Sequence, residues 1–155
     1  MKILVAGYGT VGKAHETYLR PSFDVEIYDP MKGYNDISKD IDGVIICTAT
    51  PSFENGACIV NSVYDVISRV PNVPIIIKST ISLEGWKAIK QDFPKYDITF
   101  SPEFLRNKTA TEDLANSDCD ICDKNYYAKS IQEIYKEKNL TPQQVEFLVF
   151  CQEEE

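Results

Sequence analysis

The chain is poor in histidine and in positive charge, and it contains no long apolar run. Its 155 residues include one histidine, and 16 Lys plus Arg stand against 24 Asp plus Glu, for a formal net charge of −8. This charge repels nucleic acid and anionic lipid, so we expect neither as a partner. No apolar run approaches the roughly 20 residues that cross a membrane, and no basic and apolar leader precedes the first strand. We therefore expect a soluble, cytoplasmic protein.

Metal ligands are also scarce. The 5 cysteines are an odd number, which favours reduced thiols. Cys119 and Cys122 have the spacing of a metal knuckle or of a redox pair. A zinc site needs about four ligands, and the sequence offers no second such pair and only His15 as a histidine. We therefore expect no metal, and we interpret the two thiols as part of a short strand.

The sequence does contain a glycine pattern near its start. An apolar run from Ile3 to Ala6 is followed by Gly7, Gly9 and Gly12. This pattern predicts a buried strand, a tight turn and the start of a helix, in which the second glycine lets the backbone approach a pyrophosphate. The free N–H groups of the helix start would bind the phosphates. Glycines also occur in purely structural turns, so the pattern needs support from its context.

The context agrees with a dinucleotide site. The pattern opens a segment with helical spacing, and a second apolar run, from Val25 to Tyr28, ends at Asp29, about 20 residues beyond the first glycine. A carboxylate at this place accepts hydrogen bonds from the hydroxyls of the adenosine ribose. Asp29 therefore favours NAD over NADP, because it would repel a 2′-phosphate.

Strands and helices alternate along the rest of the chain. Further strands are expected over 43–48, 74–78, 96–100 and 119–122, and helices from Cys58 to about Val70, over 83–93 and over 125–138. The segments 30–42 and 107–118 are polar, and the first has room for no more than a turn of helix. The pattern predicts an α/β fold, a Rossmann-type doubly wound parallel sheet of about six strands in three α/β/α layers. It would occupy residues 1–139, with a helical tail over 140–155.

Polar residues follow several of the predicted strands. Because parallel strands place their carboxyl ends at one edge of the sheet, these residues should line one crevice. A single Ser or Thr there can equally be the N-cap of a helix, but their recurrence favours binding. The residues are Gly7, Asp29, Thr48, Thr50, Ser79, Thr80, Ser101 and Glu103.

Segments in this order resemble the UDP-glucose/GDP-mannose dehydrogenase family. They are Val5-Ala-Gly-Tyr-Gly-Thr-Val-Gly12, Asp29, Ala49-Thr-Pro51, Ile76-Ile-Lys-Ser-Thr-Ile81 and Phe100-Ser-Pro-Glu-Phe-Leu-Arg106. In that family the amino-terminal domain binds NAD, so the resemblance implies this cofactor. It places the pyrophosphate on Gly7, Gly9, Thr10, Val11 and Gly12, the adenosine ribose on Asp29, a nearby part of the cofactor on Lys32, and the nicotinamide end near Thr50 and Thr80.

The resemblance also implies candidate catalytic residues. Thr80 would help to position a water molecule, and Glu103 would lie between cofactor and substrate. The loop that contacts the sugar nucleotide in the family corresponds to Glu103, Phe104, Leu105 and Arg106.

The chain departs from the family pattern at several places. Asn107 stands where the family has a second glutamate that transfers protons, and an amide does not transfer protons at neutral pH. Ser82 to Gly85 alters the turn after Lys78-Ser-Thr80, and the tail from Gln143 lacks the lysine of the family's central helix. None of the cysteines matches the catalytic cysteine, which the family carries in a second domain. We therefore expect a chain that stops before that domain.

Two functions remain open. The chain is either the NAD-binding domain of a nucleotide-sugar dehydrogenase, or a stand-alone NAD-binding or regulatory module without dehydrogenase activity. The expected partners are NAD and, for the first function, a UDP-sugar and a second chain that supplies the missing domain. A monomer is slightly favoured.

Overall fold

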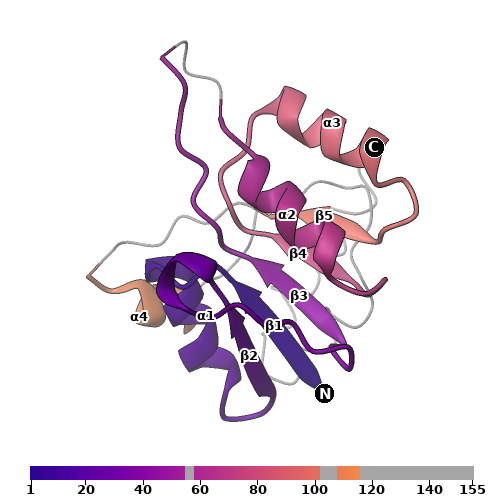
Figure 1. Cartoon of the computed structure of the whole chain (residues 1–155). Helices are drawn as coiled ribbons and strands as arrows, with labels where there is room; N and C mark the ends of the chain where they lie inside the picture. Colours follow the sequence, from indigo (N-terminus) through magenta and orange to yellow (C-terminus); the bar gives the residue numbers. More distant parts are fainter. Residues whose placement is uncertain (55–57, 102–107, 116–155) are drawn as a thin grey trace, which may run out of the picture.

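The computed structural model describes residues 1–54, 58–101 and 108–115, which form a parallel sheet flanked by helices (Figure 1). The strands are β1 (Lys2–Ala6), β2 (Asp24–Tyr28), β3 (Gly43–Ile46), β4 (Ile75–Ile77) and β5 (Ile98–Phe100). The helices are α1 (Thr10–Leu19), the 3-10 turn η1 (Pro30–Lys32), α2 (Asn61–Arg69), α3 (Leu83–Asp92) and α4 (Ala110–Ala115). None of these helices is long and apolar enough to cross a membrane.

The strands lie in the order β2-β1-β3-β4-β5, and every neighbouring pair is parallel. The chain thus winds from β1 outward to β2 and then returns to the other side of β1. Ligands of open α/β sheets bind at the carboxyl ends of the strands where the winding reverses, which here is between β1 and β3. The doubly wound parallel α/β fold that the sequence predicts is confirmed. The sixth strand predicted at 119–122, the helix at 125–138 and the tail at 140–155 lie outside the described residues.

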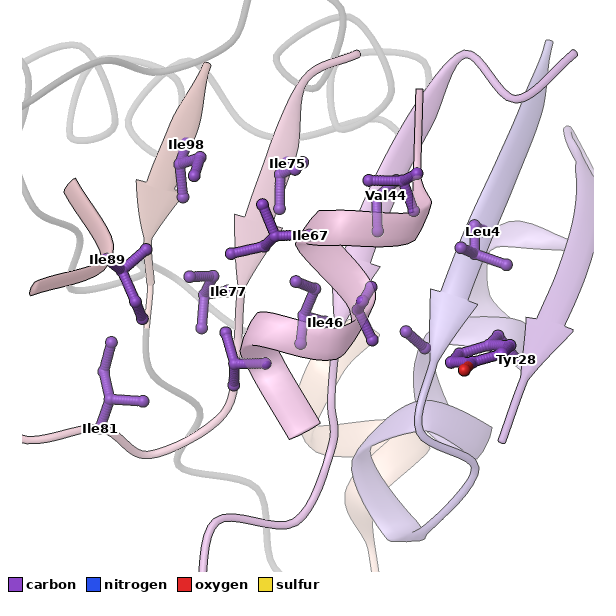
Figure 2. Packing of buried hydrophobic residues seen from close by; sticks show 14 of the residues in the cluster. Leu4, Tyr28, Val44, Ile46, Ile67, Ile75, Ile77, Ile81, Ile89 and Ile98 are labelled. Atoms are coloured by element: carbon purple, nitrogen blue, oxygen red, sulfur yellow. The ribbon is translucent and has the colours of Figure 1, made fainter. Parts of the chain in front are cut away.

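Alternate residues of the central strands pack on opposite faces of the sheet. Leu4, Val44, Ile46, Ile75 and Ile77 share one cluster with residues of α2 and α3, as Figure 2 shows. Their neighbours in sequence pack on the other face with Leu19 of α1, and they are Ile3, Val5, Ile45 and Ile76. Strands that are apolar on both faces are typical of the middle layer of a three-layer fold. Burial on both faces therefore accounts for the unbroken apolar runs of the sequence.

Two local elements differ from the sequence prediction. The second amphipathic helix begins at Asn61 and not at Cys58, because Cys58 pairs with Ser52 in an isolated bridge and the Ile59 N–H donates to the carbonyl of Pro51 (2.7 Å). The polar stretch after residue 107 contains the short helix α4. Ala110 packs there on Ala14 of α1, a contact between two small residues that leaves almost no apolar pattern in the sequence.

The connection from β2 to β3 is short, as predicted. Its one regular element is η1, which is fixed by backbone hydrogen bonds around Asp29. The Asp29 carbonyl accepts from the N–H groups of Lys32 (3.0 Å) and Tyr34 (3.1 Å), and the Asp29 N–H donates to the Tyr34 carbonyl (2.9 Å). The Gly7 N–H donates to the carbonyl of Tyr28 (2.8 Å), so the end of β2 is held beside the glycine turn.

Candidate functional site

The first and third glycines of the turn are required by packing within the protein. Gly7 has a φ of +93°, and a Cβ there would lie 2.5 Å from the carbonyl oxygen of Cys47. A Cβ at Gly12 would lie 1.8 Å from the carbonyl oxygen of Gly7. Both distances are far inside van der Waals contact, so β1, β3 and the start of α1 approach as closely as they do because these side chains are absent.

The middle glycine has no such role in packing. Among the described residues, a Cβ built at Gly9 meets no atom within 4 Å. Gly9 is the N-cap of α1, its φ is −87°, and no side chain in the described ranges caps this end of the helix. Within this part of the chain the helix therefore presents free N–H groups and open space directly above residue 9. This is the arrangement in which a phosphate approaches the backbone of a helix start.

Asp29 is fixed beside this turn by a hydrogen bond to its side chain. The N–H of Tyr8 donates to Oδ2 of Asp29 at 2.9 Å. The carboxylate is half-buried and lies at the carboxyl end of β2, next to β1. The structure therefore joins Asp29 to the glycine turn, as the sequence predicts.

Tyr8 links several residues around the glycine turn through hydrogen bonds and ring contacts. Its hydroxyl donates to Oε2 of Glu16 (2.5 Å), which raises the pKa of Tyr8, and its ring packs edge-on against Tyr34 with centroids 5.5 Å apart. Lys32 donates from Nζ to the Tyr8 carbonyl. Sequence reasoning assigned Tyr8 no role, because the glycine pattern leaves this position open to any residue.

A second group of polar residues lies at the ends of β3 and β4. Ser62 of α2 donates to Oγ1 of Thr48 (3.0 Å) and to the carbonyl of Ala49 (2.9 Å), and Ser79 donates to the carbonyl of Thr48 (2.7 Å). The Thr50 hydroxyl donates to the carbonyl of Thr80. The predicted residues Thr50 and Thr80 are thus brought together. Ser62 was missed, because it lies within a helix and not at the end of a strand.

Lys78 is a buried cation at the carboxyl end of β4. Its side chain is 2% exposed, and Nζ donates to Oγ of Ser101 at 3.0 Å, across to the end of β5. The sequence signal for this residue is a lysine directly after three isoleucines, because a charged side chain at the end of a buried apolar strand does not contribute to the apolar core. The loop residues Glu103, Phe104, Leu105, Arg106 and Asn107 lie outside the described residues.

The candidate residues thus fall into two groups at one sheet edge. The first group surrounds the β1–α1 turn and consists of Gly7, Gly9, Thr10, Val11, Gly12, Asp29 and Lys32. The second consists of Thr50 and Thr80 at the ends of β3 and β4. Within the described ranges, no three His, Cys, Asp or Glu side chains are grouped in a way that could hold a metal ion. Cys119 and Cys122 lie outside these ranges.

Comparison with known proteins agrees with this geometry. No protein-family model matches the chain. A curated UDP-glucose 6-dehydrogenase from Campylobacter jejuni is 33% identical over 119 residues, which are 73% of this chain and 30% of that protein. The chain therefore spans less than a third of the length of this relative.

Solved dehydrogenase structures have the same fold. A UDP-glucose dehydrogenase from Pyrobaculum islandicum superimposes with a TM-score of 0.65 at 18% identity, over 97% of this chain and 48% of that one. A GDP-mannose dehydrogenase from Pseudomonas aeruginosa gives a TM-score of 0.64 at 18% identity, over 88% of this chain and 44% of that one. At this identity the structural match shows a common fold, while the curated relative supports the resemblance that the motifs predict.

Proposed function

We propose that this relative of the UDP-glucose/GDP-mannose dehydrogenases binds NAD at the carboxyl ends of β1, β2 and β3, as the cofactor domain of a nucleotide-sugar dehydrogenase. The homologues are dehydrogenases, which supports a nicotinamide cofactor. The choice of NAD is inferred from the residues of this chain, while the sugar nucleotide and the roles of individual loop residues are inferred from the resemblance to the family.

The open space above Gly9 is the observation that carries the proposal. Gly7 and Gly12 are explained by contacts within the protein, but Gly9 is not, because a Cβ there would touch none of the residues that the structure describes. A glycine at this position is needed if another molecule approaches the backbone. The pyrophosphate of a dinucleotide at the start of α1 is such a molecule, since the free N–H groups and the helix dipole favour its negative charge.

Asp29 supports NAD over NADP. Its carboxylate is oriented by the Tyr8 N–H, which engages Oδ2. In the proposed complex the carboxylate accepts hydrogen bonds from the ribose hydroxyls, and a 2′-phosphate at the same place would be repelled. The same hydrogen bond ties the ribose site to the turn that holds the phosphates, so the two subsites keep a fixed spacing.

The nicotinamide end of the cofactor would lie toward Thr50 and Thr80. Bound NAD supplies the hydride acceptor for oxidation of an alcohol. The Thr50 hydroxyl already donates to the Thr80 carbonyl, which fixes the end of β3 against the end of β4 beside this position. We further propose that Glu103, Phe104, Leu105 and Arg106 contact a UDP-sugar, because the curated relative is a UDP-glucose 6-dehydrogenase.

Titration calorimetry of the whole chain with NADH tests the cofactor site. We expect binding that Gly9→Val abolishes, because the added side chain fills the space of the pyrophosphate. Asp29→Ala should weaken NADH binding and reduce the preference for NADH over NADPH. Lys87→Gln, an exposed change on α3, is the control and should bind as the unmodified chain does. Absence of heat at millimolar NADH would refute the proposal.

An NAD-binding module without dehydrogenase activity is the second candidate. It is favoured by Asn107, which cannot serve as the proton carrier that the family has at this position. Formation of NADH from NAD and UDP-glucose, followed by absorbance, distinguishes the two functions. Turnover above background by the purified chain would exclude the second candidate.

A further inference from the structure

Two lysines from different segments are held on the ring of one tyrosine beside the glycine turn. Nζ of Lys13, on α1, lies 5.4 Å from the centroid of the Tyr8 ring, and Nζ of Lys32, in η1, lies 5.8 Å from it. Both distances are within the range of a cation–π interaction, which contributes about 0.5–1 kcal/mol at an exposed site. Tyr8 therefore gathers two ammonium groups at the edge of the sheet where a phosphate would bind.

The Lys32 ammonium is also tied to the backbone of the turn, because Nζ donates to the carbonyl of Tyr8. Lys13 lines, together with Thr10, a groove between α1 and α4 to which Lys108 and the acidic Glu112 also contribute. The ammonium groups of Lys13 and Lys32 both lie near the Tyr8 ring, beside the start of α1.

The charge of these lysines is available to a ligand. Glu16 is the acidic residue that contacts the Tyr8 hydroxyl. Burial by itself would raise the pKa of Glu16, but hydrogen bonds from the Tyr8 hydroxyl and from Arg20 (2.5 Å) lower the pKa below its ordinary value. Glu16 is thus paired with Arg20, and the charge of Lys13 also helps to lower its pKa. In the described part of the chain neither Lys13 nor Lys32 forms an ion pair, and both are exposed.

We propose that Lys13 and Lys32, oriented by Tyr8, form a cationic clamp that binds the phosphates of the dinucleotide. The inference rests on the proposed function and adds to it a phosphate-binding residue, Lys13, and a positioning residue, Tyr8. A chain with a net charge of −8 repels an anionic cofactor at long range. Two cations fixed at the turn offset this repulsion at the start of α1, where the phosphates would bind. Because Tyr8 already restrains the flexible lysine side chains, they lose less conformational entropy when the ligand binds.

The salt dependence of NADH binding tests the clamp. We expect Lys13→Gln to weaken NADH binding about five-fold at about 0.1 M NaCl, where charges act over about 10 Å. At about 1 M NaCl, with screening over about 3 Å, the variant and the unmodified chain should differ less than about two-fold. Lys87→Gln, the same change at an exposed site on α3, should bind as the unmodified chain does at both salt concentrations.

Two substitutions of Tyr8 test its positioning role. Tyr8→Phe keeps the ring and removes the hydrogen bond to Glu16, so the salt-dependent part of binding should remain. Tyr8→Leu removes the ring, and it should reproduce the salt-dependent loss of Lys13→Gln. Circular dichroism confirms that each variant is folded before binding is measured.

Three results would contradict different parts of the proposal. If Lys13→Gln and Lys87→Gln bind NADH equally at low salt, or if the loss in Lys13→Gln persists at high salt, the clamp is refuted while the NAD site stands. If Tyr8→Leu keeps the salt dependence of the unmodified chain, Tyr8 does not position the lysines. If the unmodified chain fails to bind NADH at all, both the proposed function and the clamp are refuted.

Discussion

Substitutions of two glycines in the turn should affect different properties: Gly12→Ala should reduce the stability of the fold, and Gly9→Ala should weaken cofactor binding. Gly12→Ala would place a Cβ 1.8 Å from the Gly7 carbonyl oxygen, more than 1 Å inside the closest real contacts. The backbone of the turn or of α1 has to move to accept it. Overpacking of this kind costs about 1–3 kcal/mol and occasionally more, and the clash here is with rigid backbone. We therefore expect a loss of about 3 kcal/mol or more in the free energy of unfolding.

Gly9→Ala should leave the stability nearly unchanged and weaken NADH binding. The new Cβ meets no atom of residues 1–54, 58–101 or 108–115 within 4 Å, so it adds no clash with this part of the protein. The methyl group restricts the unfolded chain, which stabilises by about 0.4–1 kcal/mol, but alanine is a poorer N-cap than glycine by a similar amount. The two effects nearly cancel. We expect the free energy of unfolding to change by less than about 0.5 kcal/mol, while NADH binding weakens at least ten-fold.

Urea denaturation followed by circular dichroism measures the first quantity, and titration calorimetry with NADH measures the second. The two variants are controls for each other, because both exchange a glycine for alanine within one turn. Unchanged NADH affinity in Gly9→Ala would refute the idea that the cofactor approaches this backbone. Unchanged stability in Gly12→Ala would contradict the close approach of α1 to β1.

Further predictions concern stability. Burial raises the pKa of Asp97 to about 6 from an ordinary 3.8, and its Oδ1 has no hydrogen-bond partner in the described part of the chain. The protonated form is therefore favoured on folding, and the stability that this gives is complete below about pH 4 and is lost as the pH rises through about 6. After discounting for partial exposure, urea denaturation should show Asp97→Asn gaining about 1–2 kcal/mol over the unmodified chain between pH 4 and 8; a pH-independent difference would contradict this. Ser82→Ala removes the hydroxyl that accepts from the Gly85 N–H (3.1 Å) at the start of α3, and we expect a loss of about 1 kcal/mol by the same assay. Ile45→Ala leaves a cavity at a fully buried position of β3, so it should lower the free energy of unfolding by about 2–5 kcal/mol and leave the shape of the far-ultraviolet spectrum unchanged.

The strands could be predicted from sequence because a strand that is buried on both faces has apolar residues at consecutive positions. The runs Val44 to Ile46 and Ile75 to Ile77 are apolar throughout, and both lie in inner strands of the sheet. Parallel pairing followed from the alternation of strands with helices, and the shared sheet edge followed from parallel pairing. Each of these steps depends on local pattern and on general rules of chain winding.

The rest depends on contacts between distant residues, which no local pattern records. The hydrogen bond from Tyr8 N–H to Asp29 and the position of Lys13 on the Tyr8 ring arise only when β1, α1 and β2 are assembled. Helix α4 escaped prediction for a similar reason, since it packs through Ala110 on Ala14 and so carries no apolar stripe. Sequence reasoning therefore located the candidate cofactor site, but it could not identify which side chains orient it.

The order β2-β1-β3 also bears on how the chain folds during synthesis. These three adjoining strands all lie within the first 46 residues, and β1 pairs with both of the others. The glycine turn and Asp29 belong to the same part of the chain. As the protein emerges from the ribosome, this half of the sheet can pair before β4 and β5 have been made. The face that packs on α1 can be covered at once, whereas the opposite face remains uncovered until α2 has been made. The proposed phosphate subsite is therefore assembled from a part of the chain that is made before β4, whereas the edge formed by Thr50 and Thr80 has to wait for β4.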